Sequence, residues 1–559
     1  MTRHIRWQIL LILLGVVLVG ILLAYLAINY TTVLRPGYGG TYVEGIAGFP
    51  HRLNPLLSGY DDAERDVCAL LFSSLTRMNT SGEVEPDLAQ WDAPSLDGLT
   101  YVFHIRQDAR WHDGTPVTAD DVIFTIGLLQ DPNFPGPPEM GADVWRTVKA
   151  EKVNNFTVRF TLAEPYAPFL DYTTFGLLPK HLLEGTRAAN LLTAPFNLQP
   201  VGSGPFQLEE IEVEEGTITS MVLKPSTHYY GPQPHLGRIQ FRFYPTPQAA
   251  INAYEAGEVE GIAQIPTADL PRAEALPTLN LFSAQTSEYG IVILNLNRDD
   301  LPFFQETEVR QALLYAINRQ SIVDKVLAGQ ALVAHGPLLP DNWAYNDDAE
   351  RYDHDLEKAN ALLDEVNWKI PRRGATTRLK EGTLLSFTLL TSSEPERVGV
   401  AEMLAEQWVS IGAEVTVETA SPAEVREALE TRNFDAILIH IAAPGDPDPY
   451  SFWHQEQIDT GQNYAGFDHR HMSEVIEQAR VTVNPERRRQ LYYEFQEIFA
   501  QEVPSLPLYV PTYTYGVDES IHDVQIGPLV YPSDRFRTVS AWWIVPRRVF
   551  VSEAEAGLP

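Results

Sequence analysis

Apolar and polar positions near residue 100 change from the period of a strand to the period of a helix. Tyr101, Phe103 and Ile105 alternate with other residues, which is typical of a strand that buries one face. Residues 112–116 are dense in turn formers. Thr118 then begins the sequence Thr-Ala-Asp-Asp, which has the form of a capping box. We therefore expect a strand, a tight turn and a capped helix that ends near residue 131.

Similar signals alternate from Thr41 to about Val530, which favours an α/β architecture. Ser321 is expected to cap a helix that ends before Gly329. Asn484 precedes a proline and is expected to begin another helix. Helical stripes that we interpret as core lie in residues 309–317, 356–363, 400–411 and 491–499.

One apolar strand is followed by a loop that is a candidate site. Residues 434–441 are almost wholly apolar and are expected to form a central strand. Residues 442–449 form the loop at its carboxyl end, where ligands bind in open α/β sheets. Prolines in this loop stiffen it, which suits the shaping of a ligand site.

The N-terminal residues predict a membrane segment. Residues 7–28 carry no charge over 22 positions, enough at about 1.5 Å per residue to span a bilayer core. Arg3 and Arg6 precede the segment, so the positive-inside rule places the bulk of the chain outside the cytoplasm. A cleaved signal peptide is the alternative, but Tyr25 would occupy a position that wants a small residue. We favour an uncleaved single-pass anchor.

Composition narrows the class of protein. With 559 residues, the chain is expected to form two or three domains, and its net charge of −33 disfavours nucleic acid as a partner. The single cysteine, Cys68, excludes an internal disulfide and a thiolate metal cluster. It lies in an apolar run and is expected to be buried.

Enzyme motifs are missing from the sequence. There is no Gly-x-Ser-x-Gly elbow, no His-Glu-x-x-His zinc helix and no phosphate loop. His469 and His471 could face one side of a strand, but without a third ligand we interpret them as a solvated loop. Asp446 and Asp448 could form a catalytic acid pair, but ligand shaping explains them as well. We therefore expect no catalytic residue, no metal and no cofactor.

Several motifs resemble one family. Residues 111–122 read Trp-His-Asp-Gly-Thr-Pro-Val-Thr-Ala-Asp-Asp-Val, after an aromatic strand and a basic residue. Residues 309–319 read Val-Arg-Gln-Ala-Leu-Leu-Tyr-Ala-Ile-Asn-Arg, after the sequence Asn-Leu-Asn. Residues 53–55 and the turn at 201–206 fit as well. Together they resemble the family 5 solute-binding proteins of ABC importers, the peptide- and nickel-binding group.

This resemblance implies an α/β fold of the type II periplasmic-binding-protein kind, with two lobes, a hinge and an inserted subdomain. Residues 1–34 would be the anchor or signal segment. The predicted first lobe comprises 35–78, 200–288 and 514–559, the inserted subdomain comprises 79–199, and the second lobe comprises 289–513. The hinge segments would lie near Tyr289 and Tyr509.

The resemblance also implies where a ligand binds. The aspartate that pairs with a peptide amine in many relatives falls at Gly445, and an aromatic residue falls at Ala442, so both positions depart from the pattern. Asp446, one place further on, could substitute if the loop shifts. The candidate ligand-binding residues are Tyr60, Asp61, Ala442, Gly445, Asp446, Asp448, Tyr450 and Trp453.

The resulting hypothesis is a membrane-tethered extracytoplasmic receptor. It would enclose a peptide or another small solute between two lobes and deliver it to an ABC permease that is driven by separate ATPase subunits. The alternatives are a ligand-sensing signalling module with the same fold and an extracytoplasmic hydrolase. The missing nucleophile and metal motifs disfavour the hydrolase.

Overall fold

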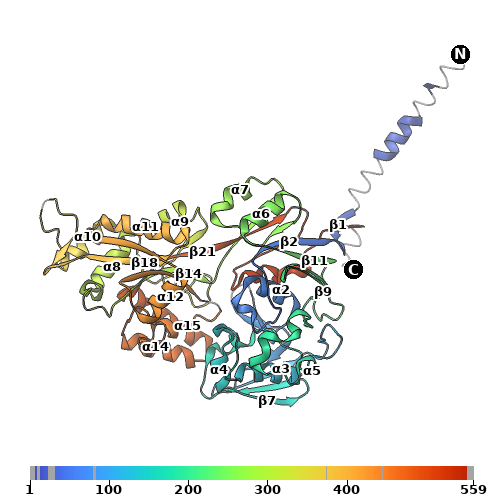
Figure 1. Ribbon diagram of the computed structural model, residues 1–559, viewed down its shortest axis with the longest axis horizontal. Coiled ribbons are helices and arrows are strands. Elements are labelled where there is room, and N and C mark those ends of the chain that lie inside the picture. The colour runs from blue at the N-terminus through green and yellow to red at the C-terminus, as the bar shows by residue number, and fades with distance from the viewer. Residues whose placement is uncertain are drawn as a thin grey trace.

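One mixed sheet of twelve strands runs through both halves of the computed structural model, which describes residues 7–8, 13–22, 32–79, 83–372, 374–443 and 445–550. Ten of these strands are hydrogen-bonded neighbours in the following order (Figure 1): β19 (Glu414–Ala420), β18 (Ser386–Ser392), β20 (Ala436–Ala442), β14 (Glu288–Leu294), β21 (Ser505–Asp518), β12 (Gly261–Ile262), β2 (Thr41–Ala47), β11 (Arg238–Tyr244), β10 (Thr217–Pro225) and β9 (Phe206–Glu214). Two further strands pair with β21: β13 (Leu279–Gln285) and β15 (Ala331–Val333).

Smaller sheets complete the β structure. A four-stranded sheet has the order β5 (Ala89–Trp91), β6 (Thr100–Ile105), β8 (Thr157–Thr161) and β7 (Lys149–Asn154). Three two-stranded sheets pair β1 (Thr32–Pro36) with β22 (Pro546–Phe550), β3 (Thr76–Met78) with β4 (Val84–Pro86), and β16 (Leu379–Lys380) with β17 (Thr383–Leu384). The pairing of β1 with β22 places residues 32–36 beside residues 546–550 (Figure 1).

Helices surround these sheets. Those before residue 280 are α2 (Asp62–Leu71), α3 (Ala119–Gln130), α4 (Ala142–Thr147), α5 (Lys180–Leu183), α6 (Pro247–Glu255) and α7 (Leu270–Glu274). Those after it are α8 (Thr307–Ala316), α9 (Arg319–Lys325), α10 (Leu356–Glu365), α11 (Pro395–Val409), α12 (Pro422–Thr431), α13 (Tyr450–Trp453), α14 (Arg470–Val481) and α15 (Pro485–Glu502). Short 3₁₀ helices include η1 (Ser58–Tyr60), η3 (Ala167–Thr173) and η9 (Pro532–Ala541).

The hydrophobic cores divide the molecule into two lobes. The first lobe has its cores among residues 42–284 and 513–542, and the second lobe has its cores among residues 289–510. Strand β21 crosses from one lobe to the other (Figure 1): Tyr509 pairs with Gly290 of β14, and Thr512 pairs with Gln285 of β13. The chain therefore passes between the two sets of cores within β21 and between β13 and β14.

Local sequence patterns predicted several elements correctly. Tyr101, Phe103 and Ile105 are the buried face of β6. The Asp121 carboxylate accepts a hydrogen bond from the Thr118 backbone N–H at 2.8 Å, which closes the capping box of α3. Helix α3 ends with its C-cap at Asp131, as expected.

Two helix starts differ from the expectation. The side chain that caps α9 is Asn318, which accepts from the Ser321 backbone N–H, so Ser321 lies inside the helix. Asparagine is as good an N-cap as serine, and the helix begins after Asn318, three residues before Ser321. His469 and His471 do not lie on a strand: His469 is the N-cap of α14, and His471 lies in its first turn.

Of the predicted membrane segment, residues 7–28, the structure describes residues 7–8 and 13–22. Residues 13–22 are helical. Within the described parts of the chain, the structure contains no helix with the length and apolar character that a membrane span needs. Cys68 lies in α2 and is buried, as its apolar neighbours predicted.

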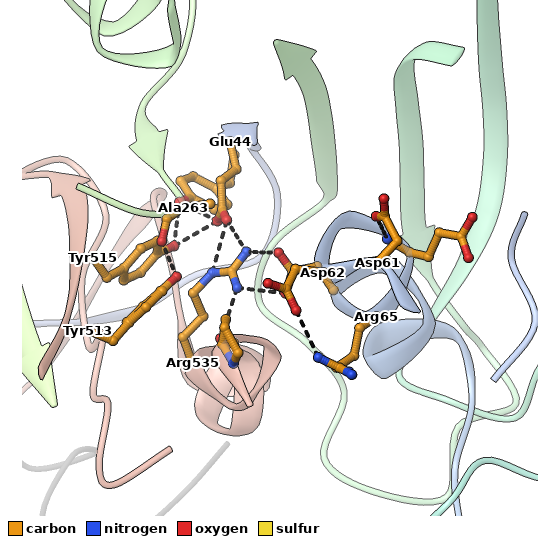
Figure 2. A network of polar contacts seen from close by, with 12 residues as sticks. Glu44, Asp61, Asp62, Arg65, Ala263, Tyr513, Tyr515 and Arg535 are labelled. Atoms are coloured by element: carbon orange, nitrogen blue, oxygen red, sulfur yellow. Dashed lines mark hydrogen bonds and ion pairs between the residues drawn. The ribbon is translucent and has the colours of Figure 1, made fainter. Parts of the chain in front are cut away.

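A buried ion cluster joins the C-terminal segment to the N-terminal strand and helix of the first lobe (Figure 2). Arg535 of η9 contacts Glu44 of β2 at 2.5 Å and Asp66 of α2 at 2.6 Å, and the three side chains are 0–3% exposed. Tyr42 and Tyr515 each donate to the second oxygen of Glu44 at 2.8 Å. Burial raises the pKa of Asp66 to about 6, against the opposing effect of Arg535.

Replacing Arg535 should destabilise the first lobe strongly. Arg535→Met leaves the carboxylates of Glu44 and Asp66 in a dry core without a cation, which costs about 3–5 kcal/mol of unfolding free energy. Urea denaturation measures this loss. Arg238→Met is the control, because it removes an exposed pair with Glu209 and should cause no measurable change. Equal stability of the two variants would contradict the structural role of Arg535.

Candidate functional site

A cavity of about 500 Å³ lies between the two lobes. The first lobe lines it from η3, from β3 and from the segment that leads into η9, and the second lobe lines it with the loop after β20. A second cavity of about 280 Å³ adjoins it, and both are lined by Arg77, Phe175 and Arg537. We call the larger space the cleft cavity. Its volume is within the range of small-molecule sites, roughly 300–1,000 Å³.

The loop after β20 contributes lining residues to the cleft cavity from the second lobe. Strand β20 lies between β18 and β14, so it is central in the sheet, as its apolar sequence predicted. The loop leads into α13, and Ala442, Asp446, Asp448 and Trp453 line the cavity. The carboxyl end of a central strand therefore carries the candidate site.

Asp446 is neutralised by a bidentate ion pair. Arg488 of α15 donates to both of its oxygens, with Nη2 2.6 Å from Oδ1, and both side chains are at most 10% exposed. Tyr492 donates to Oδ1 as well, at 3.3 Å. The Arg488 Nε–H donates to the Ala479 carbonyl oxygen at 3.0 Å, which fixes the guanidinium. Asp446 lines the cavity, but its charge is already compensated.

Asp448 has a partner of its own. Arg480 of α14 donates from Nε to the Asp448 carboxylate at 2.8 Å. The guanidinium lies 4.0 Å from the ring centre of Tyr450 and 5.1 Å from that of Tyr166, which belongs to the first lobe. Burial raises the pKa of Asp448, and Arg480 opposes that shift. The Arg480 guanidinium therefore contacts side chains of both lobes.

Asp171 of η3 is a third carboxylate at the same place. It lines the cleft cavity from the first lobe and accepts a hydrogen bond through Oδ2 from the backbone N–H of Asp446 in the second lobe. Burial and the charge of Asp446 raise the pKa of Asp171 to about 8, although the Asp446 N–H and Arg488 act in the opposite direction. Burial therefore disfavours the ionised form of this carboxyl as long as no cation lies beside it.

Gly445 lets the two lobes approach each other. Its φ is +64°, and a Cβ at this position would lie 2.3 Å from Met78 Cε and 2.4 Å from Asp171 Oδ2. The position where the resemblance placed an aspartate can thus hold only glycine in this conformation. The Asp171 carboxylate occupies the space where a side chain of residue 445 would begin.

The other predicted site residues, Tyr60, Asp61 and Tyr450, are not among the residues that line the cleft cavity. Tyr60 is 64% exposed and Asp61 is the N-cap of α2, and neither lines the cleft cavity. Tyr450 lies beside the cavity, where its ring contacts Arg480 and stacks on His454. The sequence interpretation missed Asp171, Tyr166 and the arginine partners. Nothing in the sequence relates Asp171 to Asp446, because 275 residues separate them.

The described residues around the cleft cavity contain no candidate metal site. Across the described residues, no three His, Cys, Asp or Glu side chains are grouped so that they could hold a metal ion. The imidazole of His454 near this site is wholly buried and pairs with Glu477, with 2.9 Å between Nε2 and Oε1.

Comparison with known proteins identifies the family. Residues 83–463 match bacterial extracellular solute-binding proteins, family 5 Middle. The oligopeptide-binding protein AppA of Bacillus subtilis is 28% identical over 520 residues, which cover 91% of this chain and 92% of the relative. The chain therefore belongs to the family 5 extracellular solute-binding proteins.

Solved structures agree with the two-lobed fold. The AppA structure in complex with a nonapeptide has a TM-score of 0.70 and 27% identity, and it covers 91% of this chain and 100% of that one. NikZ from Campylobacter jejuni in complex with Ni(L-His) has a TM-score of 0.72 and 27% identity, and the match covers 90% of this chain and 99% of that one. The predicted α/β, periplasmic-binding-protein-like fold and the ABC-importer family are confirmed, and the family is extracytoplasmic.

Gly445→Ala should keep the lobes apart. The Met78 methyl group can move away from a new Cβ, but Asp171 is held by the Asp446 N–H and cannot yield without losing that contact. Small-angle X-ray scattering should therefore give a larger radius of gyration.

Gly257→Ala is the control for Gly445→Ala. Gly257 has a similar φ of +73°, with nothing within 4 Å of its Cβ, so it tests the strained backbone alone, at about 1 kcal/mol. An unchanged radius of gyration for Gly445→Ala would contradict the close approach as an essential contact.

Proposed function

We propose that this chain captures a short peptide in the cleft cavity and presents it to a membrane permease, which separate ATPase subunits drive. The observation that carries the proposal is a cavity that both lobes line and that a second cavity extends. An extended peptide suits two cavities that share lining residues, because its backbone can be bound by hydrogen bonds and its side chains can enter pockets. AppA, which resembles the chain over most of its length, is described as oligopeptide-binding.

The charges around the cavity suit a ligand that carries both signs. Asp171 lies at the cleft cavity only, whereas Arg537 lines both cavities. The Nη2 atom of Arg537 is buried without a hydrogen bond in the described structure, although it lies 3.2 Å from Asp534. A free peptide has an ammonium at one end and a carboxylate at the other, so it would complement both groups.

Capture would proceed by hinge closure around the two crossings of β14 and β21. In this proposal, residues 35–78, 200–288 and 514–559 move as the first lobe together with an inserted subdomain of 79–199, and residues 289–513 move as the second. Closure is favoured because only the closed state lets the ligand contact both lobes. The chain would bind and release its ligand unchanged.

The proposal also includes a single-pass anchor at residues 7–28. The support is the uncharged sequence with Arg3 and Arg6 before it. An anchored receptor stays near its permease, which raises the effective concentration of loaded receptor there.

A ligand screen tests the proposed solute. Thermal unfolding of the full chain in detergent should rise with alanine peptides from the dipeptide to the pentapeptide, and not with maltotriose or Ni(L-His). A ligand at about 100 times its dissociation constant adds about 2.7 kcal/mol to the stability of the folded state. Free alanine is the control for nonspecific effects. A shift with maltotriose or Ni(L-His) alone would show that the ligand is not a peptide.

Deleting residues 1–30 tests the anchor. The shortened chain should move from the membrane fraction to the supernatant and keep the ligand-induced shift of the full chain, because the deletion ends before β1. Ultracentrifugation of cell extracts measures this distribution. If the shortened chain still sediments with membranes, residues 7–28 are not its attachment.

A further inference from the structure

Three carboxylates meet two guanidinium groups where the lobes come together. Arg488 binds Asp446 and Arg480 binds Asp448, each within 3 Å. Within the described residues, Asp171 has no basic side chain at ion-pair distance, although it lies against the backbone of Asp446. One carboxylate of the cleft is thus left without a cation.

The geometry of Asp171 leaves one oxygen available. Oδ2 accepts the hydrogen bond from the Asp446 N–H, whereas Oδ1 has no hydrogen-bond partner among the described residues. Asp171 lines the cleft cavity, so this unused acceptor belongs to the ligand space. An ionised carboxylate away from water is costly unless it is paired, and a cationic ligand group would supply the missing pair.

We propose that Asp171 binds a positively charged group of the solute, such as the ammonium of a peptide or of an amino compound. This inference rests on the proposed function, because it assigns a residue and a ligand class to the same cavity. Asp446 is the weaker candidate for this role. Its two oxygens are already engaged by Arg488 and Tyr492, so a ligand ammonium would have to displace a bidentate partner.

The raised pKa of Asp171 agrees with an incomplete site. The charged groups that face this carboxyl are Asp446 on the loop after β20 and Arg488 on α15, and of the two Asp446 has the larger effect. A cation beside Asp171 would lower its pKa and so favour loss of a proton from this carboxyl. Binding of an ammonium near neutral pH should therefore be accompanied by proton release.

Isothermal titration calorimetry of the full chain in detergent tests the inference. The probes are the alanine peptides of the screen with free amino termini and the same peptides with N-acetylated termini. Asp171→Asn is the test variant, because the amide oxygen can still accept from the Asp446 N–H while the charge is lost. Asp143→Asn is the matched control, since Asp143 belongs to the same lobe, is 95% exposed and does not line the cavity.

We expect Asp171→Asn to weaken the free peptides at least tenfold and to leave the acetylated peptides unchanged, whereas Asp143→Asn changes neither. Titrations of the unchanged chain in two buffers of different ionisation enthalpy should show proton release with free peptides only. This second readout requires no variant to fold.

Two results would overturn the inference, and they are distinguishable. If the unchanged chain binds free peptides and Asp171→Asn binds them equally well without a change in proton release, Asp171 only supports the loop and the proposed function survives. If the unchanged chain binds none of the peptides, the proposed function fails, and the inference fails with it.

Discussion

The arrangement of the cleft depends on one imbalance of charge. Closing the two lobes brings Asp171 against the backbone of Asp446, while Arg480 and Arg488 compensate only Asp448 and Asp446. A closed, empty cleft therefore keeps one carboxyl neutral or uncompensated, and a cationic ligand removes that penalty. Because a ligand shifts an equilibrium only through its differential affinity for two states, this contact couples binding to closure.

Such coupling needs lobes that move as rigid bodies. The first lobe is assembled from distant parts of the chain, and the buried contacts of Arg535 with Glu44 and Asp66 hold the C-terminal η9 to the N-terminal β2 and α2. Strand β21 then passes without interruption into the second lobe. The lobes therefore have separate hydrophobic cores but share one continuous sheet, so we expect the proposed hinge motion to be confined to a few residues at the crossing.

Local patterns were enough to predict much of the fold and part of the site. The alternation around Phe103, the capping box at Thr118 and the apolar strand before Ala442 each depend on neighbours within a few residues, and the structure contains all three. The motif resemblance extended these elements to a two-lobed fold. The exposed Tyr60 shows the limit of that resemblance, because a position inherited from a family pattern does not guarantee contact with this cavity.

The residues that the sequence did not reveal are those that depend on long-range contacts. The Asp446–Arg488 pair joins positions 42 residues apart, and Asp171 meets Asp446 across 275 residues, so no spacing predicts either contact. Gly445 could be noted as a departure from the family pattern, but its reason is steric and appears only when Met78 and Asp171 are placed beside it.

The most direct test of this account is a crystal structure of the full chain with the alanine peptide that binds most tightly. The account predicts closed lobes, with the peptide ammonium within about 3 Å of Asp171 Oδ1 and the Asp446–Arg488 pair intact. An ammonium bound to Asp446 with Arg488 displaced, or a peptide bound outside the cleft cavity, would contradict it.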